Sequence, residues 1–408
     1  MHPTLKALSA AERDRARADA ASALESRIDA LEADLIAVSH EIHAHPELAF
    51  EEHHAQQTLC SALGDHGVAA ERGVFTLPTA FEASFGSEAG PTVALLAEYD
   101  ALPGIGHACG HNLIATAALG ATLGLAEIGA ALPGRVRMLG TPAEEKGGGK
   151  ELMARAGAFE GVDAAMMIHP AGVNLATMPC ICVAEVEVIY HGRSAHASAM
   201  PHKGINALDA VLLAYQSIAN LRQHIRSSER IHGIITEGGQ APNIVPDRTA
   251  AEFYVRARDE RALAALKPRV QACFEAGAKA TGCEVEVRWA GVDYLDLKTN
   301  WPLAERFQTH GEALGRTFEA PEDARGMGST DMGNISHRLP SIHPMLACAP
   351  PQVVIHHPDF ERWAGSELGD KAAIDGARAL GLTAIDYLFE PELQARSRQA
   401  FELTAQLR

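Results

Sequence analysis

The sequence contains no run of 18 or more uninterrupted apolar residues. A membrane-spanning helix needs about 20 mostly apolar residues, so we expect no membrane span. Residues 1–42 are rich in alanine and charge, and they lack the apolar core of a secretory signal peptide. Basic residues are also few, because 35 Lys and Arg stand against 52 Asp and Glu, for a formal net charge of −17. Nucleic-acid binding requires a basic surface, and we therefore predict no nucleic-acid partner.

Cysteine is scarce and scattered, with seven residues in a chain of 408. These cysteines form no evenly spaced framework, which favours reduced thiols and a cytoplasmic protein. The chain is too long for one average domain, and its 47% hydrophobic and 21% charged residues are ordinary for a globular protein with a sizeable core. We therefore expect two domains.

Four short apolar runs are each followed by acidic or histidine residues. They are TVALLA (92–97) before Glu98 and Asp100, RVRMLG (135–140) before Glu144 and Glu145, AAMMI (164–168) before His169, and QVVI (352–355) before His356 and His357. Such runs, bounded by Gly and Pro, are typical of buried strands. A helical pattern at 111–132 separates the first two, which predicts a mostly parallel sheet flanked by helices. Ligands bind such sheets at the carboxyl ends of the strands, where all four polar clusters would lie.

The middle of the chain follows a different order. Residues 182–192, 230–239, 249–257 and 283–289 have strand patterns, and residues 204–225 and 259–282 have helical ones. The order β-α-β-β-α-β is the signature of a ferredoxin-like unit. Pro268 should kink the second helix or mark a late start. We predict an α/β catalytic domain made of residues 1–182 and 296–408, with an α+β domain inserted at 183–295.

The stretch HACGH concentrates metal-binding chemistry on one short segment. It places Cys109 and His111 at a helix start, where the helix N-terminus and a bound cation would both favour a thiolate. Glu144 and Glu145 leave a strand in different directions, so one can bind a metal while the other faces a substrate. Five ligands suit two zinc, manganese or cobalt ions that share a bridging ligand, for which Cys109 is the best candidate. The candidate ligands are Cys109, His111, Glu145, His169 and His356.

Six motifs in order give the chain a resemblance to a known family. They are EYDALPGIGHACGHN, GTPAEEKGGG, IHP, GRSAHASAMPHKGINALDA, APNIVPD and GSTDMGNIS. From HAHPELAFEE (43–52) to HHPDF (356–360), the chain resembles the M20 family of metallopeptidases and amidohydrolases, in particular its subfamily D. CGHN, GSTDMGNIS and PSIHPM look most like the branch of aminobenzoyl-glutamate hydrolases and M20 domain-containing protein 2.

The resemblance implies roles for individual residues. The five candidate ligands match the family's metal ligands for two divalent ions per subunit. Glu144 matches the general base, and Asp100 matches an aspartate that supports the metal site. Glu98 stands where many relatives outside this branch have a ligand histidine. Three residues match the family's substrate-contacting positions. His196 matches a histidine that reaches across a dimer and polarises the scissile carbonyl. Asn243 and Arg256 match residues that bind the substrate, and the arginine usually binds its carboxylate.

The resulting prediction is a metal-dependent amidohydrolase of N-acyl amino acids or dipeptide-like substrates. Glu144 would activate a water, and residues 183–295 would form a lid and dimerisation domain of a homodimer or higher oligomer. Two other functions stay open: an amide hydrolase with Cys109 as nucleophile, and a non-catalytic binding protein of the same fold. His357 is an alternative ligand to His356, and we expect Asp331 to orient the GSTDMGN loop.

Overall fold

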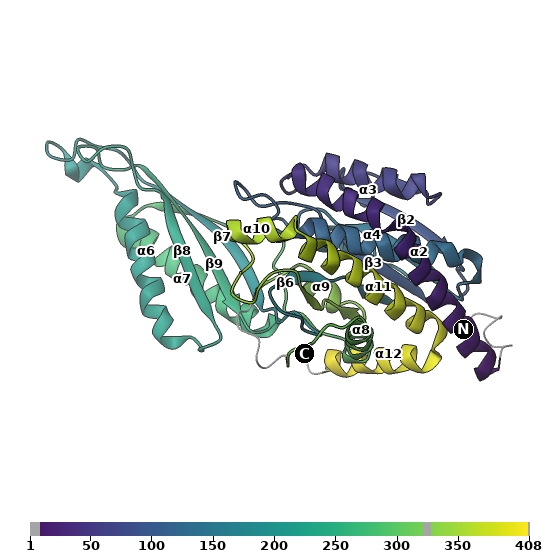
Figure 1. Cartoon of the computed structure of the whole chain (residues 1–408). Helices are drawn as coiled ribbons and strands as arrows, with labels where there is room; N and C mark the ends of the chain where they lie inside the picture. Colours follow the sequence, from purple (N-terminus) through teal and green to yellow (C-terminus); the bar gives the residue numbers. More distant parts are fainter. Residues whose placement is uncertain (1–8, 321–327, 407–408) are drawn as a thin grey trace. The chain divides into compact units, whose positions relative to one another are not determined.

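The structure is a computed structural model, and it describes residues 9–320 and 328–406 (Figure 1). The chain divides into two compact units. The second unit consists of Cys180–Asp296 together with Gly328 and Ser329, and the first contains the described residues on either side. The predicted insertion at 183–295 lies inside the second unit.

The first unit is built on a six-stranded sheet with the order β1-β2-β4-β3-β5-β11. Strands β4, β3, β5 and β11 are parallel, and β2 and β1 continue the sheet in antiparallel pairing. The predicted mostly parallel α/β sheet is therefore confirmed. The strands are β1 (Ala70–Arg72), β2 (Phe81–Gly86), β3 (Thr92–Ala97), β4 (Arg135–Gly140), β5 (Ala164–Met166) and β11 (Ser341–Ile342).

Strand β3 is buried on both faces, and its side chains alternate between the two faces of the sheet. Val93 and Leu95 point into one apolar core, and Ala94 and Leu96 into another. Helices α2 (Ala10–Ala44), α4 (His111–Ile128) and α11 (Glu367–Phe389) contribute to the first core, and α5 (Gly149–Arg155) and α9 (Met332–Ser336) to the second (Figure 1). The other elements of this unit are α3 (His53–Asp65), η1 (Gly129–Ala131), β6 (His169–Ala171), α8 (Trp301–Ala313), β12 (Met345–Ala347), α10 (Pro358–Ala364) and α12 (Pro391–Gln406).

Helix α4 is the most apolar helix of the first unit. With the turn that follows it, to Ala131, it is long and apolar enough to cross a membrane, but 72% of its most apolar window is buried inside the protein. Its glycines allow close packing against α2 and α11: a Cβ at Gly120 would lie 2.8 Å from that of Ala377, and one at Gly124 would lie 3.0 Å from Leu24. The apolar character of α4 is therefore explained by its central place in the core.

The second unit has the predicted ferredoxin-like order. Its sheet runs β10-β7-β9-β8 with every pair antiparallel, and α6 and α7 pack on it (Figure 1). The elements are β7 (Cys182–His191), η2 (Pro201–Lys203), α6 (Ala207–Leu221), η3 (Arg222–His224), β8 (Arg230–Glu237), β9 (Arg248–Ala257), α7 (Glu260–Thr281) and β10 (Glu284–Trp289).

One local prediction was wrong, and one of the two alternatives for Pro268 is excluded. Helix α7 does not start late at Pro268, because Asp259 caps it through the N–H of Ala262 and the proline lies inside. QVVI is not a strand: the N–H of Val353 bonds to the carbonyl of Pro350 in a turn, and Val354 is exposed. The two prolines before this run favour a turn over a sheet ladder. The polar cluster at 356–357 is therefore supplied by a loop.

Candidate active site

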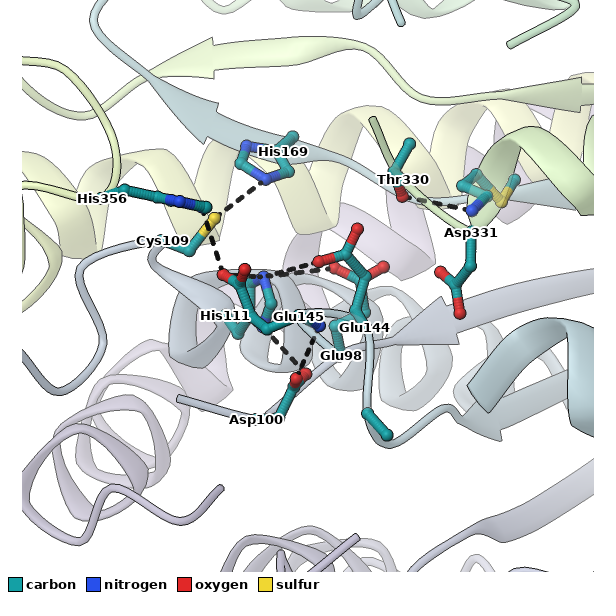
Figure 2. A network of polar contacts seen from close by, with 12 residues as sticks. Glu98, Asp100, Cys109, His111, Glu144, Glu145, His169, Thr330, Asp331 and His356 are labelled. Atoms are coloured by element: carbon teal, nitrogen blue, oxygen red, sulfur yellow. Dashed lines mark hydrogen bonds and ion pairs between the residues drawn. The ribbon is translucent and has the colours of Figure 1, made fainter. Parts of the chain in front are cut away.

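The candidate residues of the first unit gather where the parallel strands end (Figure 2). Glu98 and Asp100 follow β3, Glu144 and Glu145 follow β4, and His169 opens β6 shortly after β5. Cys109 and His111 lie at the start of α4, whose N-cap is Gly110 in the left-handed region at φ 75°. A side chain at Gly110 would meet Pro170, with its Cβ 2.6 Å from the proline Cγ. Glycine therefore lets the HACGH segment approach the residue after His169.

The two buried histidines, His111 and His169, are each oriented by a hydrogen bond at Nδ1. Nδ1 of His111 lies 3.1 Å from Oδ1 of Asp100, and Nδ1 of His169 lies 2.7 Å from the carbonyl of Pro170. With Nδ1 as the donor, the neutral form of each ring has its lone pair on Nε2, which faces the site, and metal-ligating histidines are commonly held in this way. Nε2 of His169 lies 3.5 Å from Sγ of Cys109.

The carboxylates face the same region. Oε1 of Glu145 lies 3.4 Å from Nε2 of His356 and 3.8 Å from Nε2 of His111. Glu144 approaches the same His111 nitrogen to 3.9 Å. The backbone N–H of Glu145 donates to Asp100 over 2.9 Å, so this aspartate positions both a histidine and a glutamate.

The donor atoms fit two neighbouring cation positions. Cys109, His111 and His169 offer atoms within 4.8 Å of one another, and so do Cys109, Glu145 and His356. The separations of 3.4–3.9 Å between the histidine nitrogens and the carboxylate oxygens are longer than a good N–H···O hydrogen bond. They are the spacing expected of atoms that share an ion about 2.0–2.3 Å away. Because Cys109 belongs to both groups, it has the position of a bridging ligand.

Burial shapes the protonation of these groups. Desolvation, followed by the charges of Glu98 and Glu145, raises the pKa of Glu144 well above its usual value. Burial and the Glu145 carboxylate also raise the pKa of the Cys109 thiol, which disfavours a free thiolate nucleophile beside His169. Burial and the charge of His111 lower the pKa of His169 to about 4, so its imidazole is neutral and able to bind a cation at neutral pH.

The structure separates the two adjacent histidines of the loop. His356 adopts φ 63° and faces Glu145, whereas Nδ1 of His357 accepts the N–H of Asp359 and caps α10. This arrangement favours His356 over His357 as the ligand. His343 and His107 are also buried, and His343 stacks on His169 with ring centroids 5.5 Å apart.

Two buried residues near the site were missed in the sequence. Glu52, from HAHPELAFEE, accepts the N–H of Ala143 at 2.8 Å and holds this residue in the left-handed region at φ 62°, directly before Glu144. Lys150, from the stretch KGGGK, forms ion pairs with Glu98 and Asp331. Glu52 ends the stretch HAHPELAFEE and Lys150 directly follows the motif GTPAEEKGGG, but nothing local in the sequence indicates which distant residues they contact.

In the second unit, His196 and Asn243 lie on paired loops. The N–H of Ala197 donates to the carbonyl of Asn243 over 3.0 Å, and His196 forms a β-bridge with Ile244. Nδ1 of His196 accepts the N–H of Ala199 at 3.2 Å, which leaves the proton of the neutral ring on Nε2. His196 is exposed and can therefore present an N–H donor.

Arg256 lies at the other end of the same sheet. The loops of His196 and Asn243 adjoin the pair His191–Arg248, whereas Arg256 pairs with Val183. Eight residues along a strand span about 26 Å. The Arg256 side chain donates to Ser329 at 2.9 Å and lies over the Tyr254 ring. Within the second unit of one chain, Arg256 and His196 are therefore not brought together.

The first unit has a mostly parallel α/β sheet with thiol, imidazole and carboxylate donors at its carboxyl edge, and a ferredoxin-like unit is inserted in its chain. These features together define a hydrolase of the metallopeptidase type. Residues 94–373 match the profile of peptidase family M20/M25/M40. The chain belongs to this family, and it is an enzyme that hydrolyses amide or peptide bonds.

Individual relatives agree with this assignment. The chain is 41% identical to the Xaa-Arg dipeptidase of Mus musculus over 396 residues, which cover 93% of this chain and 91% of that protein. It is 37% identical to a p-aminobenzoyl-glutamate hydrolase polypeptide of Escherichia coli (strain K12) over 302 residues, which cover 66% and 62%. A solved Bacillus subtilis structure, described as a dinuclear metal binding peptidase from the M20 family, shares the fold with a TM-score of 0.67 at 22% identity, over 88% of this chain and 99% of that one.

Proposed function

We propose that the protein is a metal-dependent dipeptidase or N-acyl amino acid hydrolase in which Glu144 is the general base. The observation that carries this proposal is the Glu144–Glu145 pair beside Cys109 and His111, with Glu145 directed at ligand histidines and Glu144 buried with a raised pKa. Two divalent ions bound by the five donors would polarise the substrate carbonyl and acidify a water.

The remaining catalytic and binding roles fall to individual side chains. Glu144 takes a proton from the attacking water and returns it to the leaving amine, and burial raises its pKa above the ordinary value, which makes it a stronger base. Asp100 fixes His111 and the backbone of Glu145. The N–H of His196 would stabilise the developing oxyanion, a contribution that is usually large. Asn243 and Arg256 would bind the substrate, and the planar Arg256 guanidinium suits its carboxylate.

We infer a homodimer through residues 180–296. Arg256 lies about 26 Å along β9 from Arg248, the end of the strand that adjoins the loops of His196 and Asn243. One substrate of dipeptide size therefore cannot reach both Arg256 and His196 on the same second unit. A partner subunit that supplies His196 and Asn243 removes this conflict.

For the substrate, we propose a dipeptide-like amide with a basic carboxy-terminal residue. The support is the 41% identity, over most of both chains, to a protein named Xaa-Arg dipeptidase. Aminobenzoyl-glutamate is the second candidate because of the more distant relative of that name.

The test is a hydrolysis panel of Xaa-Arg and Xaa-Lys dipeptides, N-acyl amino acids and aminobenzoyl-glutamate, with metal content measured on the same samples. A chelator should abolish turnover, and zinc, manganese or cobalt should restore it. Glu144→Gln should retain the metal and lose ~10²–10⁴-fold in kcat, since proton transfer contributes about that much. Its matched partner, Glu145→Gln, should lose metal instead. Chelator-resistant turnover would favour Cys109 as a nucleophile and overturn the proposal.

A further inference from the structure

Lys150 is a fully buried lysine beside the candidate metal centre. Its ammonium forms ion pairs with Glu98 and with Oδ1 of Asp331, the latter over 2.7 Å. The backbone N–H of Lys150 also donates to Oδ2 of Asp331 over 2.8 Å. None of the three side chains is exposed to solvent. Two buried carboxylates therefore share one buried ammonium.

This arrangement requires the positive charge. Burying an unpaired carboxylate costs several kcal/mol, and removing one partner from a buried ion pair is strongly destabilising. Burial opposes the charged form of Lys150, but the Asp331 and Glu98 carboxylates outweigh it and raise its pKa above the usual value. Glu98 and Asp331 thus form a cation site whose occupant, the Lys150 ammonium, belongs to the chain.

The same Glu98 also borders the candidate metal centre. Its Oε2 lies 3.6 Å from Nε2 of His111. Glu98, His111 and Glu144 offer donor atoms within 4.8 Å of one another, which is the spacing of a further cation group. By distance alone, Glu98 is therefore placed to ligate an ion, yet its Oε1 is taken by the ammonium of Lys150.

We propose that Lys150 acts as a built-in cation that holds Glu98 and Asp331 and thereby keeps Glu98 from ligating a metal ion. Lys150 is then a positioning residue: it limits the centre to the ions held by the five candidate ligands. The inference rests on the proposed metal-dependent function. It explains how a glutamate can occupy a position next to the ligands without becoming one of them.

The experiment compares two double variants of equal net charge. Lys150→Met has nearly the same shape and lacks the charge. In K150M/D331N, Glu98 stays ionisable and is released from its partner. In K150M/E98Q, it is replaced by a neutral amide. Each variant is saturated with manganese or zinc, passed through a desalting column and analysed for metal per chain, with folding checked by circular dichroism.

We expect K150M/D331N to bind one more ion per chain than the wild type, and K150M/E98Q to bind the wild-type number. The single variant E98Q should also keep the wild-type number. A purely structural role for Lys150 predicts equal metal content in the two doubles, and this result would overturn the inference. Loss of an ion in E98Q would overturn it as well, because Glu98 would then be a ligand. A wild-type protein that binds no metal would instead refute the proposed function.

Discussion

Replacing Glu52 by glutamine should change how the stability of the protein depends on pH. Glu52 is fully buried, and its Oε1 accepts the N–H groups of Phe50 at 3.0 Å and Ala143 at 2.8 Å. Burial, followed by the negative charge of Asp100, raises the pKa of Glu52 from its ordinary value of 4.5 to about 7. The folded protein therefore binds this proton more tightly than the unfolded chain does.

The sign and size of the effect follow from this difference in pKa. The contribution of Glu52 to the free energy of unfolding is fully present below pH 4.5 and is lost as the pH rises through about 7. One pKa unit corresponds to about 1.36 kcal/mol, so the whole effect amounts to about 3.4 kcal/mol. Between pH 5.5 and pH 8 the loss is about 2 kcal/mol. Glutamine keeps an oxygen acceptor for both N–H groups and has no proton to lose.

The assay is urea unfolding of the chelator-treated protein at pH 5.5 and pH 8, because bound metal would add its own stabilisation. The wild type should lose about 2 kcal/mol more than E52Q over this interval. The control is Glu51→Gln, which alters an exposed neighbour and should follow the wild type. Parallel losses in wild type and E52Q would refute a raised pKa at Glu52.

Three further predictions concern the site and its assembly. Cys109→Ser should weaken metal binding at least ~10-fold, since a serine hydroxyl is a poor substitute for a thiolate; unchanged affinity in a metal titration would remove Cys109 from the ligands. Gly110→Ala should lower the melting temperature more than Gly161→Ala, because both glycines have positive φ but only the Cβ at Gly110 would contact Pro170; equal shifts would contradict a close approach. Inactive His196→Ala and Glu144→Gln chains should regain activity when mixed, because a heterodimer contains one site with both groups; no recovery despite labelled subunit exchange would place His196 outside the partner's site.

The sequence predicted those parts of the site that depend on local pattern. Alternation of strands and helices places Glu98, Glu144 and His169 at one sheet edge whatever the distant contacts are. His356 also lies near Glu145, although the run before it is a turn and not a strand. Lys150 could not be predicted as a buried charge, because a lysine after three glycines resembles a solvated loop. Its burial depends on Asp331, 181 residues away, and a single sequence does not reveal such a pairing.

The central position of α4 has a consequence for synthesis of the chain. Helix α4 is complete at Ile128, whereas α11, which packs along it, begins only at Glu367. At ~5–20 residues per second, the ribosome needs roughly 10–50 s to make the intervening chain. During this interval the apolar surface that α11 will cover is open to other chains and to chaperones. The segment Cys180–Asp296 of the second unit is translated within the same interval and has its own core, so it can fold before the last helices of the first unit are made. The discontinuous first unit thus leaves its most apolar helix incompletely covered, and open to aggregation, while the chain is still on the ribosome.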